Sequence, residues 1–294
     1  RITYEVEDYA DRIDGCSCAV LYGVNGAMDR VFLTGHPEYP NIDRWSAFED
    51  PAYFADTDYS VLGSEGCAIA GYSIVAGMLA AHKDGEENGR NVFIRQGTLT
   101  SSGEAQFLIY DVVQAENAVA PRSFQSAMGE PMFLTRRGVF ALTDSEATGE
   151  KYAQNRSYFI NGALTREENL NDACSAMWKQ FYVLCLPKSQ RVYLMDTEQK
   201  VYEANEPQSS YQLECFVWEN VDAVCLWQEG DKLRFGTQDG AVREFWPGGK
   251  DFHYNDCRVL DEDARVEDEI AVKARWTTPL ISRIVAMSFC EPRS

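Results

Sequence analysis

The sequence predicts an all-β protein: a β-propeller of about five or more four-stranded blades, with one short helical insertion and a C-terminal exit strand. Two observations carry this prediction, a repeat of about 50 residues and tight-turn residues between paired apolar segments in each repeat. A third is the apolar content of 45%, enough for a sizeable core in 294 residues. The sequence therefore favours one repeat architecture.

Five segments are typical of a strand, a tight turn and a second strand. The expected first strands are residues 30–34, 77–81, 131–135, 181–185 and 232–236, and their partners are residues 43–46, 91–94, 138–141, 191–194 and 241–244. Both series recur every 47 to 54 residues. The connecting turns contain residues such as Asp84-Gly85 and Asn88-Gly89, which supply positive φ angles. Two independent strand positions thus share one period.

Further apolar segments flank these hairpins. The clearest upstream segments are residues 18–22, 67–70 and 223–227, and the clearest downstream segments are residues 107–110, 157–160 and 213–218. Four short strands per repeat form one propeller blade, which cannot bury its faces alone and stacks against its neighbours.

The repeats also define the expected organisation of the chain. Residues 1–15 are expected to form an N-terminal strand or arm that is part of a blade, residues 16–280 the propeller, and residues 281–294 an exit strand toward a further domain. Residues 270–279 alternate like a strand and are expected to form the outer strand of the last blade.

A short helix or helical turn is expected before the fourth hairpin. Thr165-Arg166-Glu167-Glu168 has the pattern of a capping box, which marks a helix start. Apolar side chains follow it at helical spacing, at positions Leu170, Ala173, Cys174 and Met177. We interpret this helix as an insertion in the β fold.

The charge balance argues against one class of function. The chain has 27 basic and 46 acidic side chains, a formal net charge of −19, which repels phosphate at long range. We therefore expect no specific binding of nucleic acid by the bulk surface. The longest weakly polar stretch, residues 67–81, is too short for a membrane-spanning helix, so no membrane association is expected either.

Nine cysteines stand mostly in apolar contexts, and the three histidines are far apart in the sequence. The close pair Cys16 and Cys18 lacks a second Cys or His pair at metal spacing. We interpret the cysteines as reduced core residues and expect no metal and no cofactor. Cytoplasmic synthesis is the corresponding expectation, and the opening residues Arg1–Tyr4 predict no leader.

The segment from His36 to Tyr59 is the densest cluster of aromatic and acidic residues. Its candidate binding residues are Tyr39, Asp43, Trp45, Asp50, Tyr53 and Asp56. Aromatic rings beside carboxylates are typical of a sugar site. The alternative is that Trp45 and Tyr53 pack the loop onto a blade and that Asp50 makes a turn.

No catalytic signature accompanies this segment. The sequence lacks a Gly-x-Ser-x-Gly elbow, a phosphate loop, a dinucleotide fingerprint and a His-Glu-x-x-His motif. His82 ends an expected strand and is interpreted as a surface histidine rather than a general base. We therefore assign no catalytic residue and expect a protein that is not an enzyme.

The same region resembles a known family. Residues 30–37, residues 40–46 and Asp50-Pro51-Ala52-Tyr53-Phe54 look like a signature of propeller proteins encoded by tailed bacteriophages and prophages. That signature is a strand, a Gly-Asn-Pro turn, an Arg and a Ser, and an acidic-Pro-x-Tyr-Phe motif. His36 stands where the pattern often has Asn. Residues 271–279 are similar to the Ala-x-Trp-x-Thr-Pro strand that closes such propellers.

The resemblance implies a tail nozzle or stabilization protein of the tail or connector region. We therefore expect a non-enzymatic virion component, synthesised in the bacterial cytoplasm, that contacts other virion proteins and forms a homo-oligomeric ring. Two alternatives stay open. One is a carbohydrate-binding or carbohydrate-cleaving propeller that uses residues 39–59, and the other is a cellular scaffold propeller.

Overall fold

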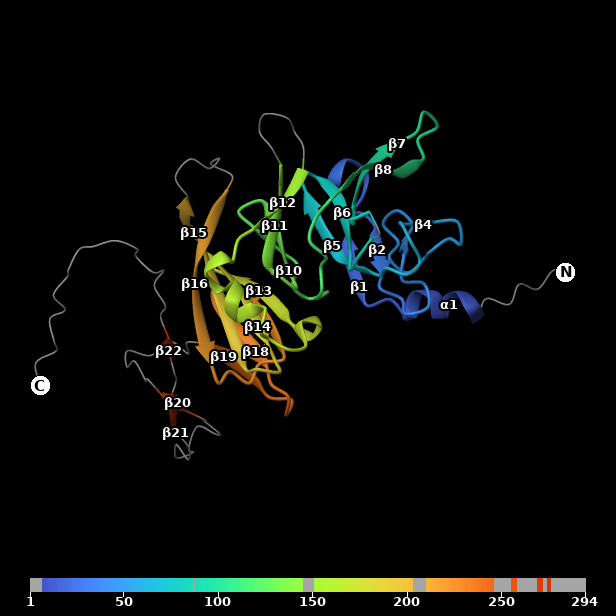
Figure 1. The fold of residues 1–294 in the computed structure, drawn as a ribbon. Coiled ribbons are helices and arrows are strands. Elements are labelled where there is room, and N and C mark those ends of the chain that lie inside the picture. The colour runs from blue at the N-terminus through green and yellow to red at the C-terminus, as the bar shows by residue number, and fades with distance from the viewer. Residues whose placement is uncertain are drawn as a thin grey trace, which may run out of the picture.

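The computed structural model describes residues 7–86, 88–144, 151–202 and 210–245, together with strands at residues 255–257, 269–271 and 274–275. Its regular structure is mainly antiparallel sheet, and five sheets follow one another along the chain (Figure 1). In each sheet the strands are hydrogen-bonded in chain order, as an up-and-down meander. The prediction of a mainly β protein is confirmed.

The bounds of the strands are as follows. Sheet 1 contains β1 (Cys18–Leu21), β2 (Val31–Thr34), β3 (Ile42–Trp45) and β4 (Tyr59–Val61). Sheet 2 contains β5 (Ile69–Val75), β6 (Met78–Lys83), β7 (Val92–Leu99) and β8 (Ala105–Val113). Sheet 3 contains β9 (Gln125–Ala127), β10 (Glu130–Thr135), β11 (Gly138–Asp144) and β12 (Lys151–Asn155). Sheet 4 contains β13 (Cys174–Trp178), β14 (Phe181–Leu186), β15 (Arg191–Tyr202) and β16 (Tyr211–Glu219), and sheet 5 contains β17 (Cys225–Glu229), β18 (Lys232–Gly236) and β19 (Val242–Phe245).

The five expected hairpins are the second and third strands of the five sheets. Local sequence explains the tightest turns. Ala76 and Gly77, between β5 and β6, both have positive φ angles, 49° and 74°, which is the geometry of a two-residue turn whose twist matches the flanking strands. This turn joins the first and second strands of sheet 2, so it is not one of the five predicted turns, and Gly77 was expected in a strand.

Each pair of consecutive sheets encloses its own apolar core. Buried members are Phe32 and Leu79 at the first junction, Ile94 and Phe133 at the second, Leu134 and Tyr182 at the third, and Val183 and Leu233 at the fourth. A sheet that contacts neighbours on both faces buries alternate side chains on each side. The four cores therefore join the five sheets into one row.

The first strands of consecutive sheets also contact one another, β1 with β5, β5 with β9, β9 with β13, and β13 with β17. Side chains join them to the next backbone. The Cys18 thiol lies 3.7 Å from the Ala70 carbonyl oxygen, and the Gln125 amide donates to the Ser175 carbonyl at 3.0 Å. The first strands thus form a continuous series along the row.

The helical predictions need correction. The first described element is helix α1 (Glu7–Asp14), within the expected N-terminal strand or arm at residues 1–15, of which residues 1–6 lie outside the described residues. Residues 158–160 form the 3-10 turn η2 (Tyr158–Ile160) instead of a strand. There the Asn155 side chain accepts a bond from the Ser157 backbone, and the Ser157 hydroxyl accepts one from Val139. These bonds turn the chain out of the sheet.

Helical structure does precede the fourth hairpin, but it does not start at Thr165 or extend to Met177. A short helix α2 (Asn161–Leu164) ends at Thr165, and only the 3-10 turn η3 (Leu170–Asp172) follows it. Asn169 has a φ angle of 55°, a left-handed conformation that interrupts a helix. Cys174 and Met177 lie in β13, where pairing with β14 overrides their helical spacing.

The C-terminal predictions have mixed outcomes. Strand β21 (Glu269–Ala271) pairs with β20 (Asn255–Cys257), and β22 (Ala274–Arg275) pairs with β16. The segment therefore adds an outer strand to sheet 4 and not to the last sheet. The expected exit strand at residues 281–294 lies outside the described residues.

Candidate functional site

Among the described residues, no other sheet covers one face of sheet 1. Alternate residues along its strands, such as Phe32 and Trp45, belong to the core shared with sheet 2. Because successive side chains point to opposite faces of a strand, Leu21, Val31 and Val61 lie on the other face. Leu21 is 50% exposed and Val61 is 55% exposed. We call this side of sheet 1 the free face.

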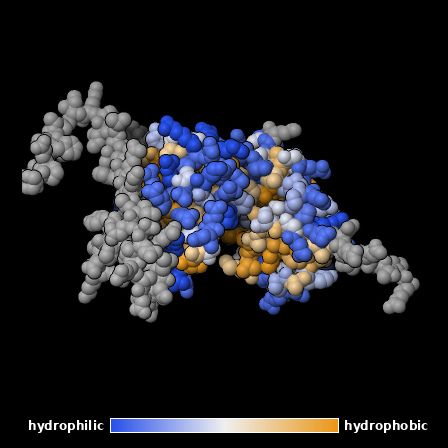
Figure 2. All heavy atoms as spheres, turned by 90° about the horizontal axis from the view of Figure 1, so that it is seen from below, coloured by the Kyte–Doolittle hydropathy of each residue, from blue (hydrophilic) through white to orange (hydrophobic). Residues whose placement is uncertain are grey.

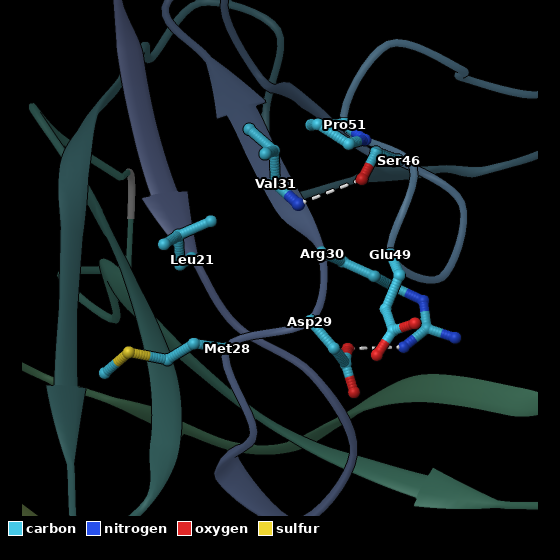
Figure 3. Close-up of a pocket in the computed structure, with 8 residues that line it drawn as sticks. All are labelled: Leu21, Met28, Asp29, Arg30, Val31, Ser46, Glu49 and Pro51. Atoms are coloured by element: carbon cyan, nitrogen blue, oxygen red, sulfur yellow. Dashed lines mark hydrogen bonds and ion pairs between the residues drawn. The ribbon is translucent and has the colours of Figure 1, made fainter.

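A hollow of about 240 Å³ opens on the free face (Figure 3). Its lining residues are Leu21, Met28, Asp29, Arg30, Val31, Ser46, Glu49 and Pro51. Leu21 and Met28 form one wall, and the loop from Ser46 to Pro51 forms the other. Met28 is the most exposed large apolar side chain of the described residues, at 74%. In the view from below, hydrophobic residues also gather on the half of the molecule that holds sheets 1 and 2 (Figure 2).

Backbone bonds hold the loop wall in place. The Val31 backbone N–H donates to the Ser46 hydroxyl at 3.0 Å, and the Glu49 N–H donates to the Asp29 carbonyl at 2.9 Å. Glu49 has a φ angle of 52°, which is unfavourable for a residue with a side chain. Strained backbone of this kind persists only where the surroundings fix it. The hollow is therefore a preformed feature of the surface.

Acidic side chains outnumber basic side chains at the hollow. The Arg30 guanidinium pairs with the Asp29 carboxylate at 2.7 Å and lies over the Phe48 ring, 5.3 Å from its centroid. Glu49 and Asp50 add two exposed carboxylates on the loop. The hollow thus combines apolar walls with a rim of one cationic and three acidic side chains.

Two of the predicted binding residues face the core between sheets 1 and 2, where Asp43 is buried and Trp45 is partly buried. The Asp43 carboxylate is buried, pairs with the Arg95 guanidinium at 3.0 Å and accepts a bond from the Tyr72 hydroxyl at 3.2 Å. Burial raises the pKa of the Asp43 carboxyl, against the opposing charge of Arg95. Trp45 packs against Phe32, with ring centroids 5.6 Å apart. Neither side chain lines the hollow.

The other four predicted residues are scattered along the loops. Tyr39 lies in the turn after β2, at the end of sheet 1 opposite to the hollow, beside the His36 ring at 5.0 Å. The Asp50 carboxylate accepts a bond from the Ala52 N–H at 3.2 Å, in the turn next to the hollow. Tyr53 and Asp56 are exposed on the following loop. The structure therefore brings only Asp50 into the immediate neighbourhood of the hollow.

His82 was expected at the surface, and this prediction is wrong. Its ring is buried between the rings of Phe124 and Phe133, and its Nε2 lies 2.7 Å from the Ser73 hydroxyl. Nδ1 has no hydrogen-bond partner. The Ser73–His82 pair is enclosed in the core between sheets 2 and 3, so it joins the sheets and is closed to a substrate.

Most of the residues that line the hollow are not among those predicted from the sequence. Met28, Asp29 and Arg30 precede β2, whereas Glu49 follows β3, and only the β2–β3 hairpin brings them together. The available signal was the strand alternation, which places Leu21 and Val31 on the side opposite to Phe32.

Within the described part of the chain, no group of three or more His, Cys, Asp or Glu side chains is arranged to hold a metal ion. Seven cysteines there are free thiols, of which Cys174 and Cys185 are buried. No helix among the described residues has the length and apolarity needed to cross a membrane. No protein-family model matches the chain, and no curated protein matches it.

Proposed function

We propose that the chain belongs to a β-propeller that serves as a non-enzymatic structural component of a phage or prophage virion, in its tail or connector region. One observation carries the architectural part of the proposal: the first strands of five meander sheets contact one another in chain order. In a propeller the first strands of successive blades surround one axis. The described row has the order that such an arrangement requires.

The residues of the phage-like signature support a structural role. Ser46 binds the Val31 backbone, the Asn41 side chain donates to the Gly63 carbonyl at 3.2 Å, and the Thr34 hydroxyl donates to the Ile42 carbonyl at 3.0 Å. Each bond fixes one connection of sheet 1. These contacts give Ser46, Asn41 and Thr34 of the signature a role in folding.

The carbohydrate alternative is less well supported. A sugar site needs accessible aromatic faces and carboxylates, but Asp43 and Trp45 are used inside the fold. Asp50 and Tyr53 remain on the surface, but no aromatic side chain is among the residues that line the hollow. We therefore favour assembly over glycan binding.

The proposed partners are other virion proteins, and a homo-oligomeric ring is part of the proposal. The net charge of −19 is compatible with a ring whose lumen lets DNA pass, because an acidic wall repels phosphate.

The first test is mass photometry of the full-length protein, alone and mixed with the virion proteins encoded beside it. We expect a ring or a stoichiometric complex, and cryo-electron microscopy of that complex should show closed propeller rings. A lasting monomer without a virion partner would refute the assembly role. Stable association with a host protein alone would favour the cellular scaffold.

A further inference from the structure

We propose that residues 105–109 on the outer edge of β8, which we call the open segment, pair antiparallel with the same residues of a second copy of this chain. The contact has twofold symmetry, so it joins two copies and is separate from the contact that closes a ring. It therefore goes beyond the proposed function and is tested by different measurements. The inference draws on the exposure of the edge, on where its protection ends and on its register.

Strand β8 is the outermost strand of sheet 2 and presents an apolar edge. In the described part of the chain it pairs with β7 on one side only, and the hairpin of β7 and β8 projects from the row of sheets (Figure 1). Leu108, Ile109 and Tyr110 are 62%, 45% and 68% exposed, and residues 105–110 carry no charge. An exposed apolar edge of this kind is a template for a further strand.

The outer strands of the other four sheets differ from β8. Strand β4 has three residues, β12 begins with Lys151, and β19 has four residues that include Arg243 and Glu244. The edge of β16 is already covered, because β22 pairs with it. Short strands, charged side chains and added chain segments are the usual protections of a sheet edge. Within the described residues, β8 is thus the outer strand that is long, apolar and uncovered.

Protection of β8 begins only after Ile109. Tyr110 is the extra residue of a β-bulge, at the point where the pairing with β7 shifts register. Further along, the Arg90 Nε donates to the Val112 carbonyl oxygen at 2.8 Å and occupies the outward edge there. Bulges and side chains that cover edge groups terminate strand pairing. The site is therefore limited to the open segment.

The backbone of the open segment defines the register of pairing. The Thr100 N–H donates to the Glu104 carbonyl at 2.8 Å, so Glu104 faces β7. Since successive residues of an antiparallel strand direct their backbone groups to alternate sides, Ala105, Phe107 and Ile109 direct theirs away from β7. A twofold axis at Phe107 places Ala105 opposite Ile109 of the second copy, so each outward N–H meets a carbonyl. An identical strand satisfies this register by symmetry.

The same register suits the side chains. The paired segments contain no charged residue, and Gln106 lies opposite Leu108 of the second copy. Pairing therefore brings no like charges directly opposite each other. The net charge of −19 on each copy opposes association at long range, and salt screens that repulsion beyond about 10 Å at 0.1 M. Because so short an edge buries little area, we expect a weak dimer that strengthens as salt concentration rises.

Sedimentation velocity of the full chain, from low to high micromolar concentration, tests for this dimer. Leu108→Lys places a charge on the edge and should weaken dimerisation about tenfold or more. Val242→Lys is the matched control, because Val242 on β19 is exposed to a similar degree, 63% against 62% for Leu108. Both variants change the net charge equally, so only a contact at β8 distinguishes them. Val242→Lys should leave the dimerisation constant near that of the unmodified chain.

Cross-linking tests the register. Gln106→Cys chains mixed with Leu108→Cys chains and oxidised glutathione should form disulfide-linked dimers, because the two positions lie directly opposite each other. Gln106→Cys mixed with Val242→Cys should cross-link no more than the unmodified chain, which controls for the native cysteines. Non-reducing electrophoresis measures the linked dimer, and circular dichroism of each variant verifies its fold.

The outcomes separate this inference from the proposed function. A monomer at every concentration, a dimer that Leu108→Lys leaves intact, or equal weakening by Val242→Lys would overturn pairing at β8. Equal cross-linking of both cysteine mixtures would overturn the register. A dimer sensitive to Leu108→Lys supports the inference whether or not a virion complex forms. Absence of any virion complex for the unmodified protein refutes the proposed function alone.

Discussion

The Arg95 guanidinium on β7 lies 3.0 Å from the Asp43 carboxylate on β3, and both side chains are fully buried between sheets 1 and 2. The two residues are 52 positions apart in sequence. Tyr72 and Ser60 complete the contacts, while Arg95 Nε has no hydrogen-bond partner. An ion pair in this position stabilises one arrangement of two sheets, because a shift of either strand would leave a buried charge unpaired.

Breaking this pair should be strongly destabilising. We expect Asp43→Asn or Arg95→Met to lower the free energy of unfolding by about 3 to 5 kcal/mol, since each leaves a buried charge without its partner. The double variant Asp43→Asn/Arg95→Met should lose clearly less than the sum of the single losses. Urea unfolding measures all four proteins. Additive losses would mean that the two side chains do not interact as the geometry indicates.

His82 should make stability depend on pH. Burial lowers the pKa of folded His82 from 6.5 to about 3, so the unfolded state binds the proton at higher pH than the folded state. The contribution of neutral His82 to the free energy of unfolding is complete above about pH 6.5 and is lost as the pH falls toward about 3. Between pH 7 and pH 5 the free energy of unfolding should fall by about 2 kcal/mol from this group.

The variant His82→Gln checks this assignment. Glutamine does not titrate in this range, so the urea midpoint of the variant should change less between pH 7 and pH 5 than that of the unmodified chain. The carboxyl pKa values of Glu86 and Glu167 are lowered, in both cases because hydrogen bonds and nearby cations outweigh burial. Those two carboxyl groups therefore change protonation below the range between pH 7 and pH 5. An identical pH response in His82→Gln would exclude His82 as the cause.

Gly97 should not tolerate a side chain. A Cβ atom at this position of β7 would lie 2.4 Å from the Gly23 carbonyl oxygen, which is backbone and cannot move aside cheaply. We expect Gly97→Ala to lower the free energy of unfolding by about 1 to 3 kcal/mol through overpacking. Gly66→Ala is the matched control, because a Cβ there would meet nothing within 4 Å. Equal thermal midpoints for the two variants would show that the strands separate to accept the methyl group.

Trp45 and Tyr53 should respond differently to truncation. Trp45 packs against Phe32 and Phe107, so we expect Trp45→Ala to lower the free energy of unfolding by about 3 kcal/mol. Tyr53 is 58% exposed, and Tyr53→Ala should change stability by less than about 0.5 kcal/mol. Thermal unfolding compares them. Loss of glycan binding in Trp45→Ala alone would therefore report on folding, and Tyr53→Ala is the cleaner probe.

The sequence by itself determined the repeat and its five hairpins, because alternating apolar residues and turn residues such as Gly89 and Gly138 act over a few positions. Only the tertiary structure decided which members of one acidic and aromatic loop face inward. Asp43 and Asp50 belong to the same acidic and aromatic segment, yet one is buried against Arg95 and the other is exposed. The difference comes from sheet 2, because its Arg95 side chain, which is distant in sequence, pairs with Asp43.

The same reason applies to the hollow and to the C-terminal strand. Met28 and Glu49 lie on opposite sides of one hairpin and line one site only after β2 and β3 pair. Strand β22 finds its partner in β16 through backbone hydrogen bonding, which carries little side-chain signal. Local pattern fixed the elements of the fold, and packing between elements distant in sequence fixed which residues the surface presents.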